Sequence, residues 1–325
     1  VLMLRHKPLR QLMLRHKPLR LEETTLHSRA MRRLTALPAL VLVLFLTVGA
    51  HQVSATDDDA DNTIAAESPK IGWFPPGDFY PRYIADPPRP QNALTIQWLS
   101  DTEIPETGAQ RFGLRLGGSF GIYRWHPEGE PDIGWQLNFE GGFAGSFDIT
   151  CSWDNTGWDG FYGLYLNWML TPNFGFRVGS QHDSSHIGDE YSERTGRKRI
   201  RYTREEGLLG VSWRFRPHVT GYAEVGVGNG LAGSVTSRVE LGVQFVSEPK
   251  YWKGRASRFA AFDLRSHEET DWSTRVTAQI GYAIPVGDRG ANHRVALEWC
   301  TGRSVLGQFL WEKETYFSIG WYYDF

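Results

Sequence analysis

His182 and Ser184 are two residues apart in a stretch that alternates like a β-strand, and Glu205 lies in the next such stretch. Side chains two residues apart share one face of a strand and can reach each other. The apolar phase that starts at Phe174 includes His182 and Ser184, and the phase through Leu209 leads back to Glu205. A serine hydroxyl becomes a nucleophile when a base takes its proton and a third group orients that base. We therefore predict one catalytic face, with Ser184 as nucleophile, His182 as base and Glu205 as orienting carboxylate.

The same polar residues have a second interpretation. The stretch from Phe174 to Ser184 is about as long as a strand that crosses the hydrocarbon of a membrane. Its polar end would then simply mark the point where the strand reaches the lipid headgroups. Ser180 shares the face and is a rival nucleophile. The sequence leaves these alternatives open.

Acidic side chains in and after this stretch are candidate metal ligands, namely Asp183, Asp189 and Glu190. Carboxylates in a loop suit calcium, and zinc would need His182 and His186 in addition. The spacing matches no defined ligand pattern. The alternative is a loop that faces lipopolysaccharide and is bridged by ions or by the basic residues of 197–201. This basic run favours anionic lipid headgroups over nucleic acid.

Alternation with a period of two dominates the chain from about Ala93 to Phe325 and predicts β-strands. In residues 133–149, for example, apolar and aromatic side chains take one parity and polar side chains the other. No apolar run after residue 50 is long enough for a membrane helix. A closed barrel also pairs every backbone group in lipid. We predict an all-β fold, a transmembrane antiparallel β-barrel of about twelve strands that spans residues 93–325.

The predicted connections alternate in length, with short ones at 171–173 and 216–218 and long polar ones at 185–200 and 301–313. An even number of strands puts both termini in the periplasm and the long loops outside the cell. The alternating stretch that ends at Phe325 resembles the sorting signal of outer-membrane barrels. We expect two kinds of partner: the barrel-assembly machinery, and outer-membrane lipids, either phospholipid or lipopolysaccharide.

Charges of both signs take the inward parity of the predicted strands. They are Arg115, Glu140, Asp148, Arg177, Arg214, Glu224, Arg238, Glu240, Asp263, Arg265, Arg275 and Glu298. About twelve strands leave a lumen of modest width, and an unpaired buried charge is costly. We therefore expect these charges to pair across the lumen. This argues against a wide porin and leaves a narrow channel open.

Three predicted segments precede the barrel. Residues 1–30, in which LMLRHKPLR occurs twice, are interpreted as spurious upstream translation, with a genuine basic leader as the alternative. Residues 31–55 have the charged start, apolar run and small-residue cleavage site of a signal peptide, and Pro38 within the run argues against a membrane anchor. Residues 56–92 are acidic and then proline-rich, which excludes a central strand or helix. We expect this periplasmic segment to pack on the rim or in the lumen of the barrel.

Composition narrows the class of partner and the role of the cysteines. A formal net charge of −2 argues against nucleic-acid binding, which needs a basic surface. A secreted chain enters an oxidising compartment, where a disulfide is permitted. Cys151 and Cys300 are nevertheless predicted on non-neighbouring strands with opposite parities, so we expect free thiols.

Three motifs resemble an uncharacterised bacterial family of outer-membrane barrels, a domain of unknown function. They are FPPGDFYPRYIADPPRPQNAL at 74–94, SSHIGDEY at 184–191 and YTRE at 202–205. The likeness covers about residues 71–325 and implies a barrel in the bacterial outer membrane, without an activity.

The hairpin 174–215 also resembles the outer-membrane phospholipase A and lipid A deacylase barrels, which carry His-x-Ser on a lipid-facing strand. That resemblance implies His182 as base, Ser184 as nucleophile and, more loosely, Glu205 as the orienting group. Ser185 stands where those enzymes have asparagine, which is a departure from their pattern. The expected function is a lipid acyl-ester hydrolase at the outer leaflet. The alternative is a non-enzymatic barrel, either a narrow channel or an envelope structural protein.

Overall fold

The computed structural model describes residues 71–230, 233–252, 255–286 and 291–324. The predicted upstream segment, signal peptide and acidic tail lie outside this range. Within it, no helix is both long enough and apolar enough to span a membrane.

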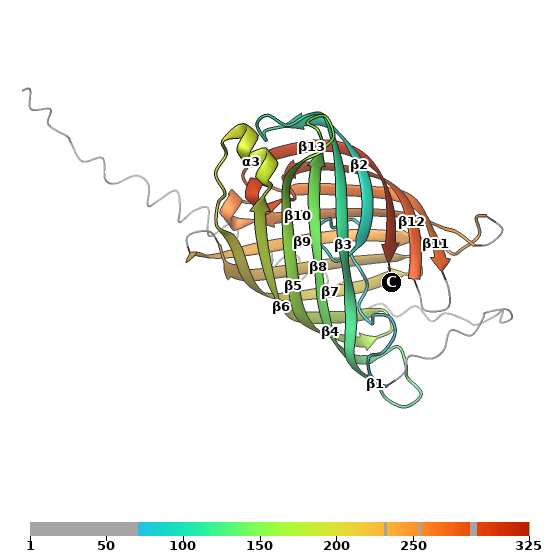
Figure 1. Cartoon of the computed structure of the whole chain (residues 1–325). Helices are drawn as coiled ribbons and strands as arrows, with labels where there is room; N and C mark the ends of the chain where they lie inside the picture. Colours follow the sequence, from blue (N-terminus) through green and yellow to red (C-terminus); the bar gives the residue numbers. More distant parts are fainter. Residues whose placement is uncertain (1–70, 231–232, 253–254, 287–290, 325) are drawn as a thin grey trace, which may run out of the picture. The chain divides into compact units, whose positions relative to one another are not determined.

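Twelve antiparallel strands, β2 to β13, form one closed ring (Figure 1). Each strand pairs with the next along the chain, and β13 pairs back to β2 in the register Tyr323↔Asn92. Closure leaves no unpaired sheet edge, as lipid requires. The predicted all-β antiparallel barrel is confirmed. The ring strands are β2 (Asn92–Thr102), β3 (Gln110–Trp125), β4 (Gly134–Asp148), β5 (Asp154–Thr171), β6 (Phe174–Ile187), β7 (Tyr202–Arg216), β8 (Val219–Asn229), β9 (Val235–Val246), β10 (Ser257–His267), β11 (Arg275–Val286), β12 (Ala291–Arg303) and β13 (Lys313–Asp324).

A few short elements accompany the ring. The strand β1 (Gly72–Trp73) pairs with β3, and the helix α3 (Asp189–Thr195) lies in the connection between β6 and β7. The 3-10 helices η2 (Glu268–Thr270) and η3 (Gly307–Phe309) lie in two further connections. The helix α3 and the strand β1 are at opposite ends of the barrel (Figure 1). The two ends of the barrel are referred to below by these elements, as the α3 end and the β1 end.

The pleat gives the barrel two faces of opposite character. Large apolar side chains are exposed on the outward face, including Leu116, Phe120, Leu164, Val178, Leu209, Ile280, Leu297, Phe317 and Ile319. Charged and amide side chains are buried on the inward face. A closed barrel with an apolar exterior and a polar interior is suited to lipid. The protein is a bacterial outer-membrane β-barrel.

The predicted inward charges pair with one another. All of them except Arg214 are buried. Arg177 donates to Glu140 at 2.5 Å, and Arg238 donates to Glu224 at 2.5 Å and to Glu240 at 2.6 Å. Arg214 is exposed near the end of β7. The expected pairing of mixed charges is thus found for most of these residues, whereas Asp148 and Asp263 accept hydrogen bonds from neutral groups instead.

The proline-rich chain before β2 lies inside the barrel, in one of the two places expected for it. We call residues 74–91 the lumen segment. Its Asp78 accepts hydrogen bonds from Ser119 at 3.0 Å and from Asn138 at 2.7 Å, on strands β3 and β4. Its Tyr83 stacks on Tyr222 of β8, with ring centroids 3.7 Å apart. The lumen segment therefore crosses from one wall of the barrel to another.

Asp86 anchors the lumen segment to the far wall. Its carboxylate accepts hydrogen bonds from Arg265 at 2.6 Å and from Arg275 at 3.3 Å, and it forms an ion pair with Arg89 at 3.3 Å. Arg89 in turn donates to Glu224. Both ends of each ion pair are buried, so neither charge can exchange its partner for bulk water.

The connections follow the predicted alternation only in part. The turns 172–173 and 217–218 are tight, and 188–201 and 304–312 at the other end are long. The end with the tight turns also carries the longer connections 126–133 and 247–256. Longer loops cost little additional closure entropy, so the barrel tolerates them at either end. Cys151 lies in a connection and Cys300 is buried, and both thiols are free as predicted.

We expect Asp86→Ala to lower the free energy of unfolding by about 3 kcal/mol, because it leaves three guanidinium groups buried without the carboxylate with which they pair. Urea titration of the detergent-solubilised barrel measures this difference. Asp189→Ala, which removes an exposed carboxylate in α3, is the control and should change the stability little. Equal stability of the two variants would show that Asp86 does not anchor the lumen segment.

Candidate active site

Strands β6 and β7 bring the predicted trio to one outward face. His182 pairs directly with Glu205, and Ser184 pairs with Thr203. The alternate residues of β6, such as Asp183, point into the lumen. The parity of the sequence therefore placed His182, Ser184 and Glu205 on the correct side of the sheet, and their chemical roles stay predictions.

His182 and Glu205 form a hydrogen-bonded pair, with 2.5 Å between His182 Nδ1 and Glu205 Oε1. A carboxylate beside Nδ1 favours the proton on that nitrogen, which leaves Nε2 as an acceptor. This is the tautomer that a general base needs. The arrangement matches the base and orienting roles predicted for these two residues.

Two residues that the sequence analysis did not single out support the pair. Tyr162 of β5 stacks on the His182 ring, with centroids 4.7 Å apart and an interplanar angle of 20°. The backbone N–H of Glu205 donates to Asn229 Oδ1 at 2.5 Å. Parity alone would have turned Tyr162 outward, but its position beside His182 depends on the β5–β6 register. Tyr162 thus supports the imidazole ring, and Asn229 holds the backbone at Glu205.

Ser184 lies beside this pair but is not bonded to it. Its hydroxyl donates to the backbone oxygen of Gly160 at 3.4 Å, a long and therefore weak hydrogen bond. A Cβ at Gly160 would lie 3.6 Å from Ser184 Oγ, in van der Waals contact. The structure thus brings His182 and Glu205 together and places Ser184 two residues along the same face.

The rival nucleophile Ser180 lies on the other side of His182. It pairs with Gly207 of β7 and with Leu164 of β5, and it is exposed. A Cβ at Gly207 would meet only one backbone oxygen, at 4.0 Å. Glycines thus flank both serines, so the face is shallow on either side of the histidine.

The site lies near the end of β6 that leads to α3. Trp158 of β5 stacks on His186, with centroids 4.0 Å apart, beyond the trio. Val178 and Leu209 are exposed apolar residues on the other side. Aromatic side chains are typical of the boundary between lipid and water. The order along the two strands therefore places the trio between the apolar band and the loops.

The structure does not bring the predicted metal ligands together. Asp183 faces the lumen and accepts hydrogen bonds from Gln181 at 2.7 and 2.9 Å. Asp189 and Glu190 are exposed in the first turn of α3. The pleat separates them, because Asp183 has the opposite parity to its sequence neighbours His182 and Ser184. Calcium stays a prediction, and these three residues do not form one set of ligands for it.

A different group of carboxylates is close enough to share a cation, with ligand atoms within 4.8 Å of one another: Asp86, Glu240 and Asp263. Arg265 bridges the first two, at 2.6 Å from each. A guanidinium already supplies positive charge there. The cluster is therefore explained by ion pairing within the lumen.

Comparisons with known proteins agree with the architecture. The family model described as "Protein of unknown function (DUF1207)" matches residues 50–325. No curated protein matches the sequence. Three solved structures illustrate the likeness in fold: outer membrane phospholipase A from Escherichia coli (12% identity, TM-score 0.45, 72% of this chain and 92% of that chain), NanC porin (14%, 0.43, 72% and 100%) and LpxR from Salmonella typhimurium (11%, 0.35, 72% and 100%). Likenesses this distant carry no argument about activity.

Engineered cysteines test the β6–β7 register on which the site depends. In a chain with Cys151 and Cys300 replaced by serine, we expect the pair Ser184→Cys and Thr203→Cys to form a disulfide on oxidation, because directly opposite strand residues are within bonding distance. The pair Ser180→Cys and Thr203→Cys is the control and should stay reduced. Gel mobility with and without reductant reports both. Cross-linking of the control pair alone would mean a different register.

Proposed function

The chain belongs to the family of proteins of unknown function DUF1207, and from that premise we propose that it is an outer-membrane hydrolase of lipid acyl esters. One observation carries the proposal. It is the hydrogen bond between His182 Nδ1 and Glu205 Oε1 on the outward face, with the Ser184 hydroxyl two residues along the same strand. A carboxylate on the outer wall of a membrane barrel is costly unless it has a partner or a task. The partner of the Glu205 carboxylate is the imidazole of His182.

The chemistry would proceed by acyl transfer to serine. The Ser184 hydroxyl rotates from Gly160 to His182 Nε2, gives up its proton and attacks the ester carbonyl carbon. The imidazolium that forms is stabilised by Glu205 and returns the proton to the leaving alcohol. Water, deprotonated by the same imidazole, then releases the fatty acid from the serine.

The surroundings support a lipid as the substrate. Val178 and Leu209 offer an exposed apolar surface on which acyl chains can lie. Above the site, Lys198, Arg199 and Arg201 are exposed, and Arg199 lies within electrostatic range of His186. Basic side chains beside a membrane attract anionic headgroups. Phospholipid and lipopolysaccharide both combine such a headgroup with acyl esters.

Ser184→Ala should lower the rate of ester hydrolysis at least about 10³-fold, because it removes the nucleophile. Release of fatty acid from phospholipid in mixed micelles measures this with the purified barrel. Ser180→Ala is the matched control, since it removes a hydroxyl from the same face. Full activity of Ser184→Ala together with loss in Ser180→Ala would transfer the nucleophile role to Ser180. Full activity in both variants would contradict the serine mechanism.

The second candidate is a non-enzymatic barrel, either a narrow channel or an envelope structural protein. The observation that favours it is the lumen segment, which crosses the interior and is tied to the wall by buried ion pairs. A barrel occupied in this way would conduct only after the segment moves.

Planar-bilayer recordings separate a closed barrel from a channel. The unmodified chain should show no steady open-pore current, because the lumen segment obstructs the interior. The double variant Asp86→Asn with Arg89→Gln should show frequent openings, since it weakens the anchor to β8, β10 and β11. Arg214→Gln, a change at an exposed position of β7, is the control. A steady pore in the unmodified chain would contradict the closed lumen.

A further inference from the structure

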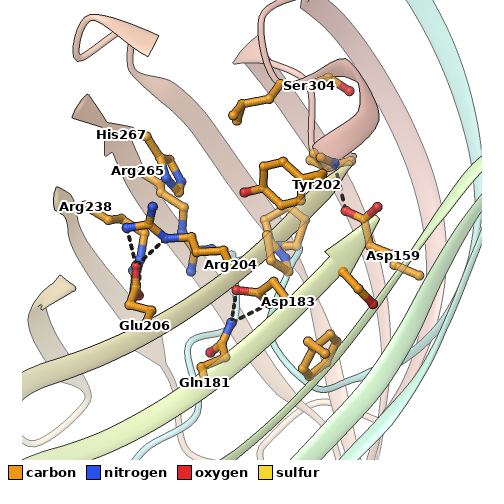
Figure 2. Close-up of a pocket in the computed structure, with 18 of the residues that line it drawn as sticks. Asp159, Gln181, Asp183, Tyr202, Arg204, Glu206, Arg238, Arg265, His267 and Ser304 are labelled. Atoms are coloured by element: carbon orange, nitrogen blue, oxygen red, sulfur yellow. Dashed lines mark hydrogen bonds and ion pairs between the residues drawn. The ribbon is translucent and has the colours of Figure 1, made fainter. Parts of the chain in front are cut away.

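The half of the lumen towards α3 contains a polar chamber. It has a volume of about 80 Å3, large enough for several waters or one small solute. Pro87 and Pro88 of the lumen segment line it, as do Ser304, Val305, Gly307 and Leu310 before β13. The remaining lining comes from strands β3 to β7 and β9 to β11. Figure 2 shows side chains from both sides converging on this space.

One wall of the chamber carries carboxylates without a cationic partner. Asp159 of β5 accepts hydrogen bonds from the Ser185 hydroxyl and, at 2.9 Å, from the Gly307 backbone N–H. Asp183 of β6 accepts from the amide of Gln181. Among the described residues, neither carboxylate has an Arg, Lys or His nitrogen within 4.0 Å, the limit for an ion pair. The hydrogen-bond donors to both carboxyl groups are therefore neutral groups.

The opposite wall carries guanidinium groups with spare donors. In a ring of twelve strands β5 lies opposite β11, which carries Arg275, and β10 carries Arg265. Both arginines are more than nine-tenths buried, and their Nε atoms have no hydrogen-bond partner in the described chain. Arg115, on β3 and therefore to the side of this wall, has Nη1 unbonded and Nη2 3.6 Å from Glu298. Figure 2 shows Arg265 and Asp159 on different sides of the chamber.

This separation of charge defines the ligand that the chamber fits. An anion alone would satisfy the arginines and leave Asp159 and Asp183 beside an added negative charge. A cation alone would leave the spare guanidinium donors buried and unpaired, which is costly. A solute with a carboxylate at one end and an ammonium at the other satisfies both walls. Charge-assisted hydrogen bonds of this kind are among the stronger ones available to a protein.

We propose that the chamber binds a small zwitterion of the amino-acid class. The carboxylate of the ligand lies against Arg275 and Arg115, and its ammonium lies against Asp183 and Asp159. The pleat puts the side chains of Asp183 and His182 on opposite sides of β6, and Ser184 is the one residue of the outward trio that also contributes to the lining of the chamber.

Calorimetric titration of the full-length barrel in detergent tests the proposal. The probes are glycine, β-alanine and 4-aminobutyrate, whose charges are increasingly far apart, with acetate and methylammonium as probes for each half. At least one of the three zwitterions should bind at least tenfold more tightly than acetate and than methylammonium. Acetate binding as tightly as every zwitterion would overturn the proposal in favour of a simple anion site. Absence of binding by all three zwitterions at millimolar concentration would overturn it as well.

Isosteric variants locate the binding. Asp183→Asn and Arg275→Gln should each weaken zwitterion affinity at least tenfold, and Asp183→Asn should leave acetate affinity unchanged or higher. Arg214→Gln, an exposed change on the lumen parity of β7, should bind like the unmodified chain. Unchanged affinity in both chamber variants would place the ligand elsewhere and overturn the assignment. Heat-modifiable mobility on gels checks that each variant is a folded barrel, and the ranking of probes on the unmodified chain decides the question if a variant does not fold.

Discussion

Pairing of β13 with β2 closes the sheet, and this closure separates two environments that are only one residue apart along each strand. In an open sheet both faces could meet water. In the closed ring one face meets lipid and the other meets a lumen too narrow to hydrate every charge. The inward charges must therefore find partners within the protein, and the lumen segment supplies several of them. These ion pairs form a connected network, since Asp86, Glu206, Glu224 and Glu240 each contact more than one guanidinium.

The hairpin of β6 and β7 shows the effect of this separation most directly. His182 and Asp183 are consecutive, yet the first contacts Glu205 on the outside and the second contacts Gln181 on the inside. On β7, Glu205 lies outside while Arg204 and Glu206 pair in the lumen at 2.8 Å. One hairpin thus positions the candidate active site and part of the chamber. Neither arrangement needs a loop, because hydrogen-bonded strands hold both.

The sequence predicted those features that depend on parity and missed those that depend on distance across the lumen. Alternation was sufficient to put His182 and Glu205 on one face and to turn Arg238 and Glu240 inward, but the register that makes His182 and Glu205 direct partners did not follow from it. Asp86 contacts arginines far away in the sequence, and no local pattern contains that contact. The grouping of Asp183 with Asp189 and Glu190 did not hold, since closeness along the chain says nothing about which side of the pleat a residue takes.

The alternation in this hairpin also has a genetic meaning. On β6 the even-numbered positions from 180 to 186 face outward and the odd-numbered positions face the lumen, and on β7 the order is reversed. Missense changes at adjacent codons would therefore fall into different phenotypic classes, one concerned with the membrane boundary and the other with the interior. Selection on either property would leave a two-codon rhythm in the tolerated substitutions. This alternating pattern of tolerated substitutions would distinguish the outward role of the hairpin from its role in the lumen, even before any ligand is known.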